Sequence, residues 1–542
     1  MTGGGTRRRT ASRAVAVGTG GLLVALALPA QAAVADSGRP CEERDNATYQ
    51  QLLDCVTLEG VRAHQERFQE IADQEQKSDY PGSRAAGTPG YAASVEYVAE
   101  RLEEAGYEVS FSPVEFDYNF PAVLRQLTPV AGEYETGVFT GSGSGTVQGT
   151  VVPVDVSLAP PRASTSGCEA TDFAGTDWSG GADIALVQRG TCTFGLKARN
   201  AQDAGAEAVV VFNQGDAPDR EALLVATAAF LDLESTQPSE LTIPVVGASF
   251  AQGEALAQAG ATAFVEVLPS ERRTDQSVIA ELPGRNRDNV VMAGAHLDSV
   301  TDGPGINDNG SGSAALLETA LMMANTEHEN TLRFGWWAAE ELGLLGSAAY
   351  VASLSPEERD RIALYTNYDM VGSPNHVQMV YDADQSTFQA PVPVPAGSAA
   401  VEDVYERYYT LIGEPYDDTE FSGRSDYEAF ILNDIPSSGL FTGAEVVKTE
   451  AQAAIWGGTA GEAFDPCYHA DCDTYGNVNE HALDVNSDLI AFAMLTFAAS
   501  TESVNGVPGR PVPGEFPALP EPAGPRGTFA TAAGGGAEHA AA

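Results

Sequence analysis

Strand and helix patterns alternate through the second half of the chain. Residues 278–284 form a predicted strand, and residues 288–296 are almost all apolar, as expected for a strand that is buried on both faces. A helix pattern follows over 313–324, and two more strands are predicted over 332–341 and 362–371. This alternation predicts an α/β domain with helices on both faces of a central sheet.

Two amphipathic helices and a strand are predicted earlier in the chain. Residues 57–76 have apolar positions at helical spacing, and a second helix starts at 87–90 and ends at Gly106. The alternating stretch 107–116 is typical of a strand. These elements are expected to complete the same domain.

Residues 126–265 have a different pattern of short strands and turns. The glycine-rich stretch 141–154 lacks the strand-then-helix context of a phosphate-binding loop. Residues 185–213 predict strand, helix and strand, with the turn R-G-T-C-T-F before the helix. This segment resembles the protease-associated domain, which implies a mostly-β lid or interaction module inserted into a larger domain.

Composition and charge narrow the class of protein. The chain has 542 residues, 43% hydrophobic and 19% charged, which is typical of a globular protein with more than one core. It has 29 Lys and Arg against 76 Asp and Glu, a net charge of -47. Such a surface favours solubility and excludes nucleic acid and anionic membranes as partners.

The amino terminus has the pattern of a signal peptide. Three arginines at 7–9 precede the apolar run 14–28 and an A-x-A cleavage signal. We therefore expect a secreted, extracellular protein that begins near 33–36 and has no membrane anchor, since no later stretch is predicted to be long enough to span a membrane. The predicted division is a signal peptide over 1–35, segments of the α/β domain over 36–125 and 266–505, the inserted domain over 126–265, and a flexible Pro/Gly/Ala-rich tail over 506–542.

An even number of cysteines in an exported chain predicts disulfides. The six cysteines are clustered in the sequence, which favours the local pairs Cys41–Cys55, Cys168–Cys192 and Cys467–Cys472. Zinc binding by thiolates is the competing interpretation, but the chain contains no C-x-x-C pair.

Acidic and histidine side chains follow the predicted strands. A single aspartate at a strand end is usually a helix cap or a loop residue. Several buried carboxylates cost several kcal/mol each without a positive partner, and Lys and Arg are scarce nearby, so a metal is the simplest explanation. The residues concerned are His296, Asp298, Asp308, Glu340, Glu341, Asp369 and His469.

The donor types indicate which metal this site would bind. Two imidazoles with several carboxylates and no thiolate suit zinc in a hydrolytic site, or calcium if the histidines are excluded. Two ions that share a bridging carboxylate, about 3.5–4 Å apart, would form a two-metal hydrolase site. The remaining histidines are interpreted as structural or exposed: His64, His328, His376, His481 and His539.

The motifs H-L-D-S-V…G-I-N-D-N-G-S-G, A-A-E-E-L-G-L-L-G-S, N-Y-D-M-V-G and Y-H-A-D-C-D occur in order over 296–473. Together they resemble the co-catalytic dizinc aminopeptidases, metallopeptidase family 28, of the secreted bacterial leucyl type. The resemblance implies a mixed central sheet of the zinc exopeptidase type and two zinc ions. It also implies a role for each residue: zinc ligands His296, Asp308 (bridging), Glu341, Asp369 and His469, the general base Glu340, the oxyanion donor Tyr468, and Asp298 orienting His296.

The same resemblance implies a substrate site around Gly423-Arg424-Ser425-Asp426. Arg424 would help to place the substrate end, and Met370, Gly423 and Phe441 would line the side-chain pocket. Apolar walls favour a large first residue such as Leu, Met or Phe. We expect peptides with a free amino terminus as substrates, and a monomer.

Three other functions remain open at this point. A dizinc carboxypeptidase of acidic peptides would need a basic pocket, and a zinc glutaminyl cyclase uses one metal. A non-catalytic binding homologue would be expected to have lost ligands, whereas this set is complete. The sequence therefore favours the aminopeptidase.

Overall fold

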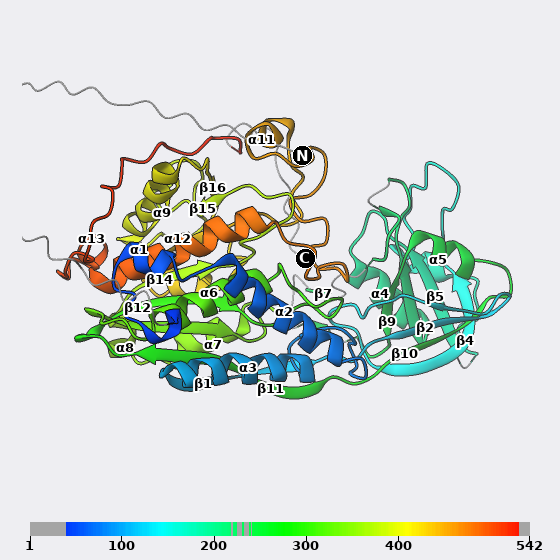
Figure 1. The fold of residues 1–542 in the computed structure, drawn as a ribbon. Helices are drawn as coiled ribbons and strands as arrows, with labels where there is room; N and C mark the ends of the chain where they lie inside the picture. The colour runs from blue at the N-terminus through cyan, green and yellow to red at the C-terminus, as the bar shows by residue number, and fades with distance from the viewer. Residues whose placement is uncertain are drawn as a thin grey trace, which may run out of the picture. The chain divides into compact units, whose positions relative to one another are not determined.

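The computed structural model describes residues 40–529 except 181, 218–219, 225–229, 232–237 and 240, and only the backbone of 230–231 and 238–239. The predicted signal peptide and the last part of the predicted tail lie outside the described residues. Two large sheets organise the chain (Figure 1).

The larger sheet has eight strands within the described residues, in the order β1-β11-β13-β12-β14-β17-β15-β16. Strand β12 runs parallel to β13 and β14, and β14 runs parallel to β17, whereas β11 is antiparallel to both β1 and β13. This confirms the predicted mixed sheet. The strands are β1 Glu108–Tyr118, β11 Glu271–Leu282, β12 Asn286–His296, β13 Asn330–Trp337, β14 Ile362–Tyr368, β15 Met379–Tyr381, β16 Asp417–Thr419 and β17 Ser437–Phe441.

Alternate residues of the central strands enter two different cores. Val291 and Leu364 pack into a large core with the helices α2, α3, α6, α9 and α12, whereas their neighbours Met292 and Tyr365 pack into a second core with α7 and α10. Because successive strand side chains point to opposite faces, helices cover both sides of the sheet. The helices are α2 Leu58–Gln74, α3 Pro89–Ala105, α6 Gly310–Met323, α7 Leu345–Ser353, α9 Ser398–Ile412, α10 Glu428–Ile431 and α12 Glu480–Ala499.

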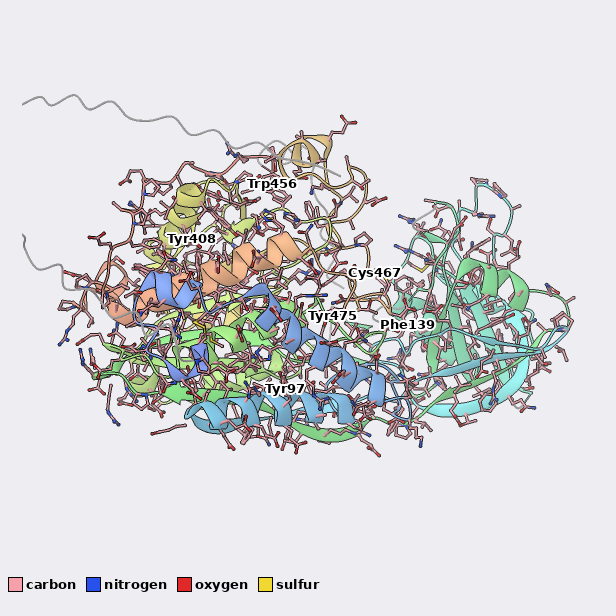
Figure 2. All side chains as sticks on the ribbon, in the orientation of Figure 1. Tyr97, Phe139, Tyr408, Trp456, Cys467 and Tyr475 are labelled. Atoms are coloured by element: carbon pink, nitrogen blue, oxygen red, sulfur yellow. A yellow bond between two sulfur atoms is a disulfide. The ribbon has the colours of Figure 1, made fainter. Side chains whose placement is uncertain are left out.

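The two early helices begin and end at the residues that the sequence indicates. The Thr57 and Thr88 side chains each accept a hydrogen bond from a main-chain N–H of the first turn, and Gly106 ends α3 in the left-handed conformation. Figure 2 shows the side chains on the ribbon, with Tyr97 on α3 and Tyr408 on α9.

Helix α12 differs from the sequence-based expectation that no later stretch is long enough to span a membrane. It has 20 residues and is apolar enough for a span by length and composition, but 72% of its most apolar window is buried inside the protein. Most of its side chains lie in the large core, which explains the composition without a membrane.

The second sheet has seven strands in the part of the chain that the structure describes, in the order β3-β2-β10-β4-β5-β6-β9. The predicted strand, helix and strand over 185–213 are confirmed as β5, α4 and β6. Two apolar cores, one on each face, separate this sheet from solvent. The elements are β2 Val123–Thr128, β3 Gly132–Tyr134, β4 Gly145–Pro153, β5 Asp183–Gln188, α4 Phe194–Ala204, β6 Ala208–Phe212, β9 Val245–Ala248, α5 Phe250–Leu256 and β10 Thr262–Val267.

The six cysteines form the three predicted disulfides. The pair Cys467–Cys472 closes a loop of only a few residues that contains His469. The remaining short elements are η1 Cys41–Glu43, α1 Tyr49–Leu53, η2 Ala170–Phe173, β7 Phe230–Leu231, β8 Pro238–Ser239, α8 Pro356–Asp360, α11 Glu450–Trp456 and α13 Glu502–Asn505.

Candidate active site

The chemistry-bearing side chains meet where β12, β13 and β14 end. These three strands are parallel, so their carboxyl ends lie at one edge of the sheet. His296 is the last residue of β12, and Asp369 follows β14 directly. Strand β13 ends at Trp337, so Glu340 and Glu341 lie in the loop beyond it, and the expectation that they end the strand is wrong. The main chain has therefore already left the sheet when it reaches these two glutamates.

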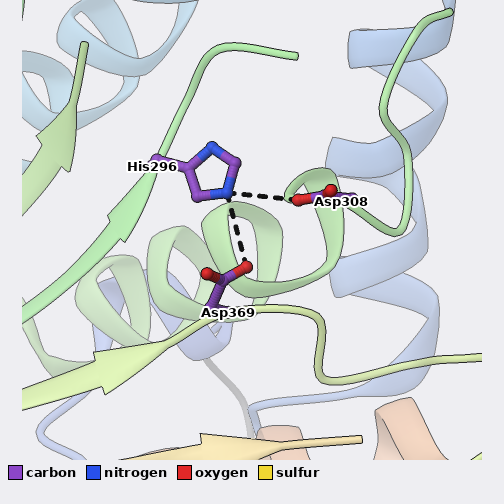
Figure 3. Close-up of side chains that lie close together, drawn as sticks. All are labelled: His296, Asp308 and Asp369. Atoms are coloured by element: carbon purple, nitrogen blue, oxygen red, sulfur yellow. Dashed lines mark ion pairs between the residues drawn. The ribbon is translucent and has the colours of Figure 1, made fainter. Parts of the chain in front are cut away.

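Two aspartates face one histidine nitrogen in the first group of possible ligands (Figure 3). The Nε2 atom of His296 lies 3.2 Å from Oδ1 of Asp308 and 3.3 Å from Oδ1 of Asp369. All three residues are buried. One oxygen or nitrogen from each lies within 4.8 Å of the others, which is close enough for one ion to contact all three.

A second group shares Asp308 with the first. The Nε2 atom of His469 lies 3.0 Å from Oε2 of Glu341 and 3.3 Å from Oδ2 of Asp308. Asp308 therefore presents Oδ1 to His296 and Oδ2 to His469. The His469 side chain is 40% exposed, whereas the His296 side chain is 1% exposed, so the site opens to solvent on the His469 side. We call these five residues the histidine cluster: His296, Asp308, Glu341, Asp369 and His469.

A glycine permits the close approach that brings Asp308 beside Asp369. Helix α6 begins just after Asp308, and a Cβ atom added at Gly312 in its first turn would lie 2.2 Å from the main-chain oxygen of Tyr368. Any larger residue would push α6 away from the end of β14. The glycine-rich sequence after Asp308 thus has a packing function.

The electrostatics of the histidine cluster favour a bound cation. Oδ1 of Asp369 and Oε1 of Glu341 are buried and accept no hydrogen bond. Burial, followed by the charge of Asp308, raises the pKa of Glu341 to about 7. Burial also raises the pKa of Glu340 well above its usual range, against the opposing charge of His296. Two imidazoles and three carboxylates without a thiolate are donors that suit zinc, so these residues fit the metal that the sequence predicts.

Asp298 contacts both sides of the site. The Nδ1 atom of His296 faces the main-chain oxygen of Asp298 at 3.0 Å, which favours a proton on Nδ1 and leaves Nε2 free to bind a metal. The Asp298 carboxylate accepts hydrogen bonds from the main-chain N–H groups of Glu340, at 3.1 Å, and Glu341, at 3.3 Å. Asp298 therefore holds the imidazole through its backbone and the two glutamates through its side chain.

The predicted substrate residues lie on the exposed side of the site. Arg424 donates hydrogen bonds to Oε1 of Glu445, at 2.7 Å, and to the Tyr468 hydroxyl, at 3.3 Å. The Tyr468 ring stacks on the His469 ring with centroids 3.8 Å apart. Tyr468 and Arg424 therefore lie next to the second ligand group.

The other predicted pocket residues are less exposed. Met370 is 2% exposed and directly follows Asp369, and Phe441 at the end of β17 is half-buried. Gly423 adopts a left-handed conformation, with φ 77°, and its N–H donates to the Tyr427 hydroxyl at 2.8 Å. Gly423 thus shapes the turn that carries Arg424.

Two residues of the predicted substrate stretch, Ser425 and Asp426, lie beside Asp369, a placement that the sequence does not predict. The Ser425 hydroxyl donates to Oδ2 of Asp369 at 2.5 Å and accepts a hydrogen bond from Asn367 at 2.8 Å. Asp426 is 1% exposed and both of its carboxylate oxygens are buried without a hydrogen-bond partner. Burial raises the pKa of Asp426 to about 7. The sequence indicates the stretch, but the contacts of the two side chains depend on the fold.

Two further residues hold the loop that carries Asp308. The Asp473 carboxylate accepts hydrogen bonds from the main-chain N–H groups of Asn307, at 2.8 Å, and Asp308, at 2.9 Å. The buried Arg84 guanidinium donates to the carbonyl oxygens of Pro304, at 2.8 Å, and Gly305, at 2.7 Å. No local motif marks Arg84, which is far from this loop in the sequence.

Comparison with known proteins shows which family the chain resembles. Residues 277–494 match the model of Peptidase family M28, and residues 147–256 match that of the PA domain. An aminopeptidase from Pseudomonas aeruginosa is 45% identical over 448 residues, 81% of each chain. Leucine aminopeptidase 2 from Trichophyton equinum is 36% identical over 506 residues, 91% of this chain and 92% of its own.

A solved structure has a similar fold. A zinc aminopeptidase from Bacillus subtilis superposes with a TM-score of 0.59 at 25% identity, over 81% of this chain and 94% of its own. The family motifs, the mixed sheet and the bacterial relative at 45% identity agree with one another. The chain therefore belongs to peptidase family M28 and includes a PA domain.

Proposed function

We propose that this protein is an exported aminopeptidase that binds two zinc ions and removes large hydrophobic residues from the amino terminus of peptides. The observation that carries the proposal is the position of Asp308, with one oxygen toward His296 and the other toward His469. A carboxylate shared in this way is what two neighbouring ions need. The aminopeptidase class itself follows from the family and from relatives that are 36% and 45% identical.

The histidine cluster supplies ligands for both ions. His296 and Asp369 would hold one zinc, Glu341 and His469 the other, and Asp308 both. When bound in such a site, zinc polarises a carbonyl group and lowers the pKa of water towards about 7. The buried oxygens of Asp369 and Glu341 that accept no hydrogen bond are the atoms that gain most from this charge.

Glu340 is the proposed general base. Its carboxylate would take a proton from the attacking water as the water oxygen bonds to the peptide carbonyl carbon. As the C–N bond breaks, the same carboxylate would return the proton to the departing amine nitrogen. Asp298 fixes the main chain of Glu340 through its hydrogen bond of 3.1 Å, which positions the base.

Tyr468 is the proposed donor to the carbonyl oxygen of the substrate. Its hydroxyl accepts a hydrogen bond from Arg424, so its own proton is free to be donated. A donor placed at the developing oxyanion is worth about 3 kcal/mol in transition-state stabilisation. Arg424 thus orients Tyr468 in addition to its predicted contact with the substrate end.

The charges at the site support a free amino terminus as the recognised group. Glu340 and Asp369 would pair with a substrate ammonium, which an acetylated peptide lacks. Met370 and Phe441 would contact an apolar first side chain, and each buried methylene contributes about 0.8 kcal/mol. Export is supported by the predicted signal peptide and by three disulfides, which persist in oxidising compartments.

One set of substrates tests this proposal. We expect a peptide that begins with Leu to have a higher kcat/KM than matched peptides that begin with Ala or Glu, and an N-acetylated Leu peptide to be cleaved poorly. Efficient cleavage of the acetylated peptide would contradict an aminopeptidase. A preference for Glu would contradict the apolar pocket but leave the aminopeptidase activity standing.

A further inference from the structure

Three large apolar side chains are exposed directly beside residues of the candidate active site in the chain. Leu342 follows the proposed zinc ligand Glu341, and Val446 and Val447 follow Glu445. Their exposed fractions are 47%, 46% and 54%. We call Leu342, Val446 and Val447 the apolar rim.

A continuous series of side-chain contacts connects the two parts of the apolar rim. Glu341 faces Nε2 of His469 at 3.0 Å, and the His469 ring stacks on the Tyr468 ring. The Tyr468 hydroxyl accepts a hydrogen bond from Arg424, whose guanidinium also donates to Glu445 at 2.7 Å. These contacts form one row across the exposed side of the site, and the apolar rim adjoins both ends of the row.

Main-chain hydrogen bonds hold both parts of the apolar rim in place. The turn that carries Leu342 closes on the carbonyl oxygen of Glu340, which accepts two main-chain N–H groups at 2.8 Å. The segment that carries Val446 and Val447 pairs with residues 461–465 through several main-chain hydrogen bonds. The rim therefore holds its apolar side chains in solvent at fixed positions.

The position of these side chains indicates a function more than their exposure does. Single exposed apolar side chains are common on soluble proteins and need no explanation. Leu432, for example, is 57% exposed and precedes Asn433, which accepts a hydrogen bond from Arg359 just before β14. Leu432 thus lies near the start of β14, whereas the site lies at the end of that strand. The apolar rim is different because it adjoins the open side of the site.

The proposed reaction determines which part of a peptide would reach the apolar rim. An aminopeptidase holds one residue on the amino side of the bond that it cuts, and the rest of the peptide must leave the site. The inner side is closed, since His296 and Met370 are 1% and 2% exposed, whereas the His469 side chain is 40% exposed. With Tyr468 at the carbonyl oxygen of the cut bond, the residues after that bond would run outward beside Tyr468, toward the rim.

We propose that the apolar rim contacts the peptide beyond the cut bond and makes the enzyme favour substrates with an apolar second residue. This inference rests on the proposed aminopeptidase function and adds a substrate class to it. Contact between the rim and an apolar second side chain removes apolar surface of both from water, which favours binding. A polar second side chain would lose water there without gaining a partner, because Arg424 is already paired with Glu445.

Initial rates of the zinc-loaded full chain on three substrates test the apolar rim. Leucine amide releases ammonia and has nothing that could reach the rim, whereas Leu-Leu-Gly and Leu-Asn-Gly have second side chains of similar shape and different polarity. From the loss of intact peptide, we expect kcat/KM for Leu-Leu-Gly to exceed that for Leu-Asn-Gly roughly tenfold. Leu342→Ser and Val447→Ser should each lower this ratio roughly threefold, and should lower the ratio of Leu-Leu-Gly to leucine amide by a similar factor.

Two matched variants serve as controls. Leu342→Met keeps an apolar side chain in the rim, and Leu432→Ser makes the same polar change at an exposed position near the start of β14, so both should keep the wild-type ratios. Unchanged ratios in both rim serine variants, or an equal loss in Leu432→Ser, would overturn the proposal.

Leucine amide separates this inference from the proposed function. If the wild type cleaves leucine amide but does not distinguish Leu-Leu-Gly from Leu-Asn-Gly, the inference about the apolar rim is wrong and the aminopeptidase function stands. If the wild type cleaves none of the three substrates, the proposed function is wrong and the inference fails with it.

Discussion

The histidine cluster and a second group of carboxylates, Asp382, Glu402 and Asp418, both lie at the larger sheet, but their donors and exposure differ. The histidine cluster has two imidazoles, and its His469 side chain is 40% exposed. Beside it lies Glu340, whose pKa is raised well above its usual range by burial. The second group has carboxylate oxygens alone, and its three residues are almost fully buried. A catalytic metal site needs an open position for substrate, whereas a structural one is closed. Burial and donor type thus distinguish the two groups of carboxylates more clearly than charge does.

The largest loss of activity is expected for Glu340→Gln, next to the histidine cluster. We expect kcat to fall about 10²- to 10⁴-fold because the general base is lost, while bound zinc stays the same because Glu340 is not a proposed ligand. Steady-state kinetics with elemental analysis measures both. Glu341→Gln is the matched comparison and should lose zinc. Near-normal turnover in Glu340→Gln would remove Glu340 from the mechanism.

The next largest effect is expected for Tyr468→Phe. Loss of the hydroxyl removes one donor to the oxyanion and should lower kcat about 10²- to 10³-fold with little change in KM. The ring that stacks on His469 remains, so zinc content should not change. A fall in zinc with unchanged kcat per zinc-loaded chain would instead make Tyr468 a support for His469.

Asp298→Asn tests whether Asp298 positions the two glutamates that lie on the other side of it from His296. The amide cannot accept both main-chain N–H groups, so Glu340 and Glu341 should lose their fixed position. Mutation of a residue that holds metal ligands in place typically lowers metal affinity or activity 10- to 100-fold. Zinc affinity measured by competition with a chelator should fall by about this factor, and unchanged affinity and kcat would contradict the proposed role.

The smallest effect should come from a change in the second group of carboxylates. Asp418→Asn should change kcat/KM for a leucine substrate by less than about twofold when zinc is saturating, because Asp418 contacts none of the histidine cluster. A loss of tenfold or more at 25 °C, with the protein still folded, would contradict the separation of the two clusters.

The sequence predicted the elements whose patterns are local. Strand β12 and helices α2 and α3 have clear periodicity and caps, and each pair of cysteines is close in the sequence. It misplaced the end of β13, because apolar residues continue to Ala339 after the strand has ended. It also discounted α12, whose apolar composition reflects the burial of most of its side chains in the protein.

The missed site residues act over long sequence distances. Arg84 contacts a loop some two hundred residues away, and Asp473 holds main-chain N–H groups of Asn307 and Asp308. Neither contact leaves a periodic or local pattern. The second group of carboxylates is similar, since Asp382, Glu402 and Asp418 meet only when β16 pairs with β15.

The most direct test of the central claim is a zinc titration of the metal-free protein, with bound zinc and turnover of a leucine substrate measured at each step. If Asp308 bridges two ions, binding should saturate at two zinc ions per chain, and Asp308→Asn should weaken both. Saturation at one zinc per chain with full activity would contradict the two-metal account.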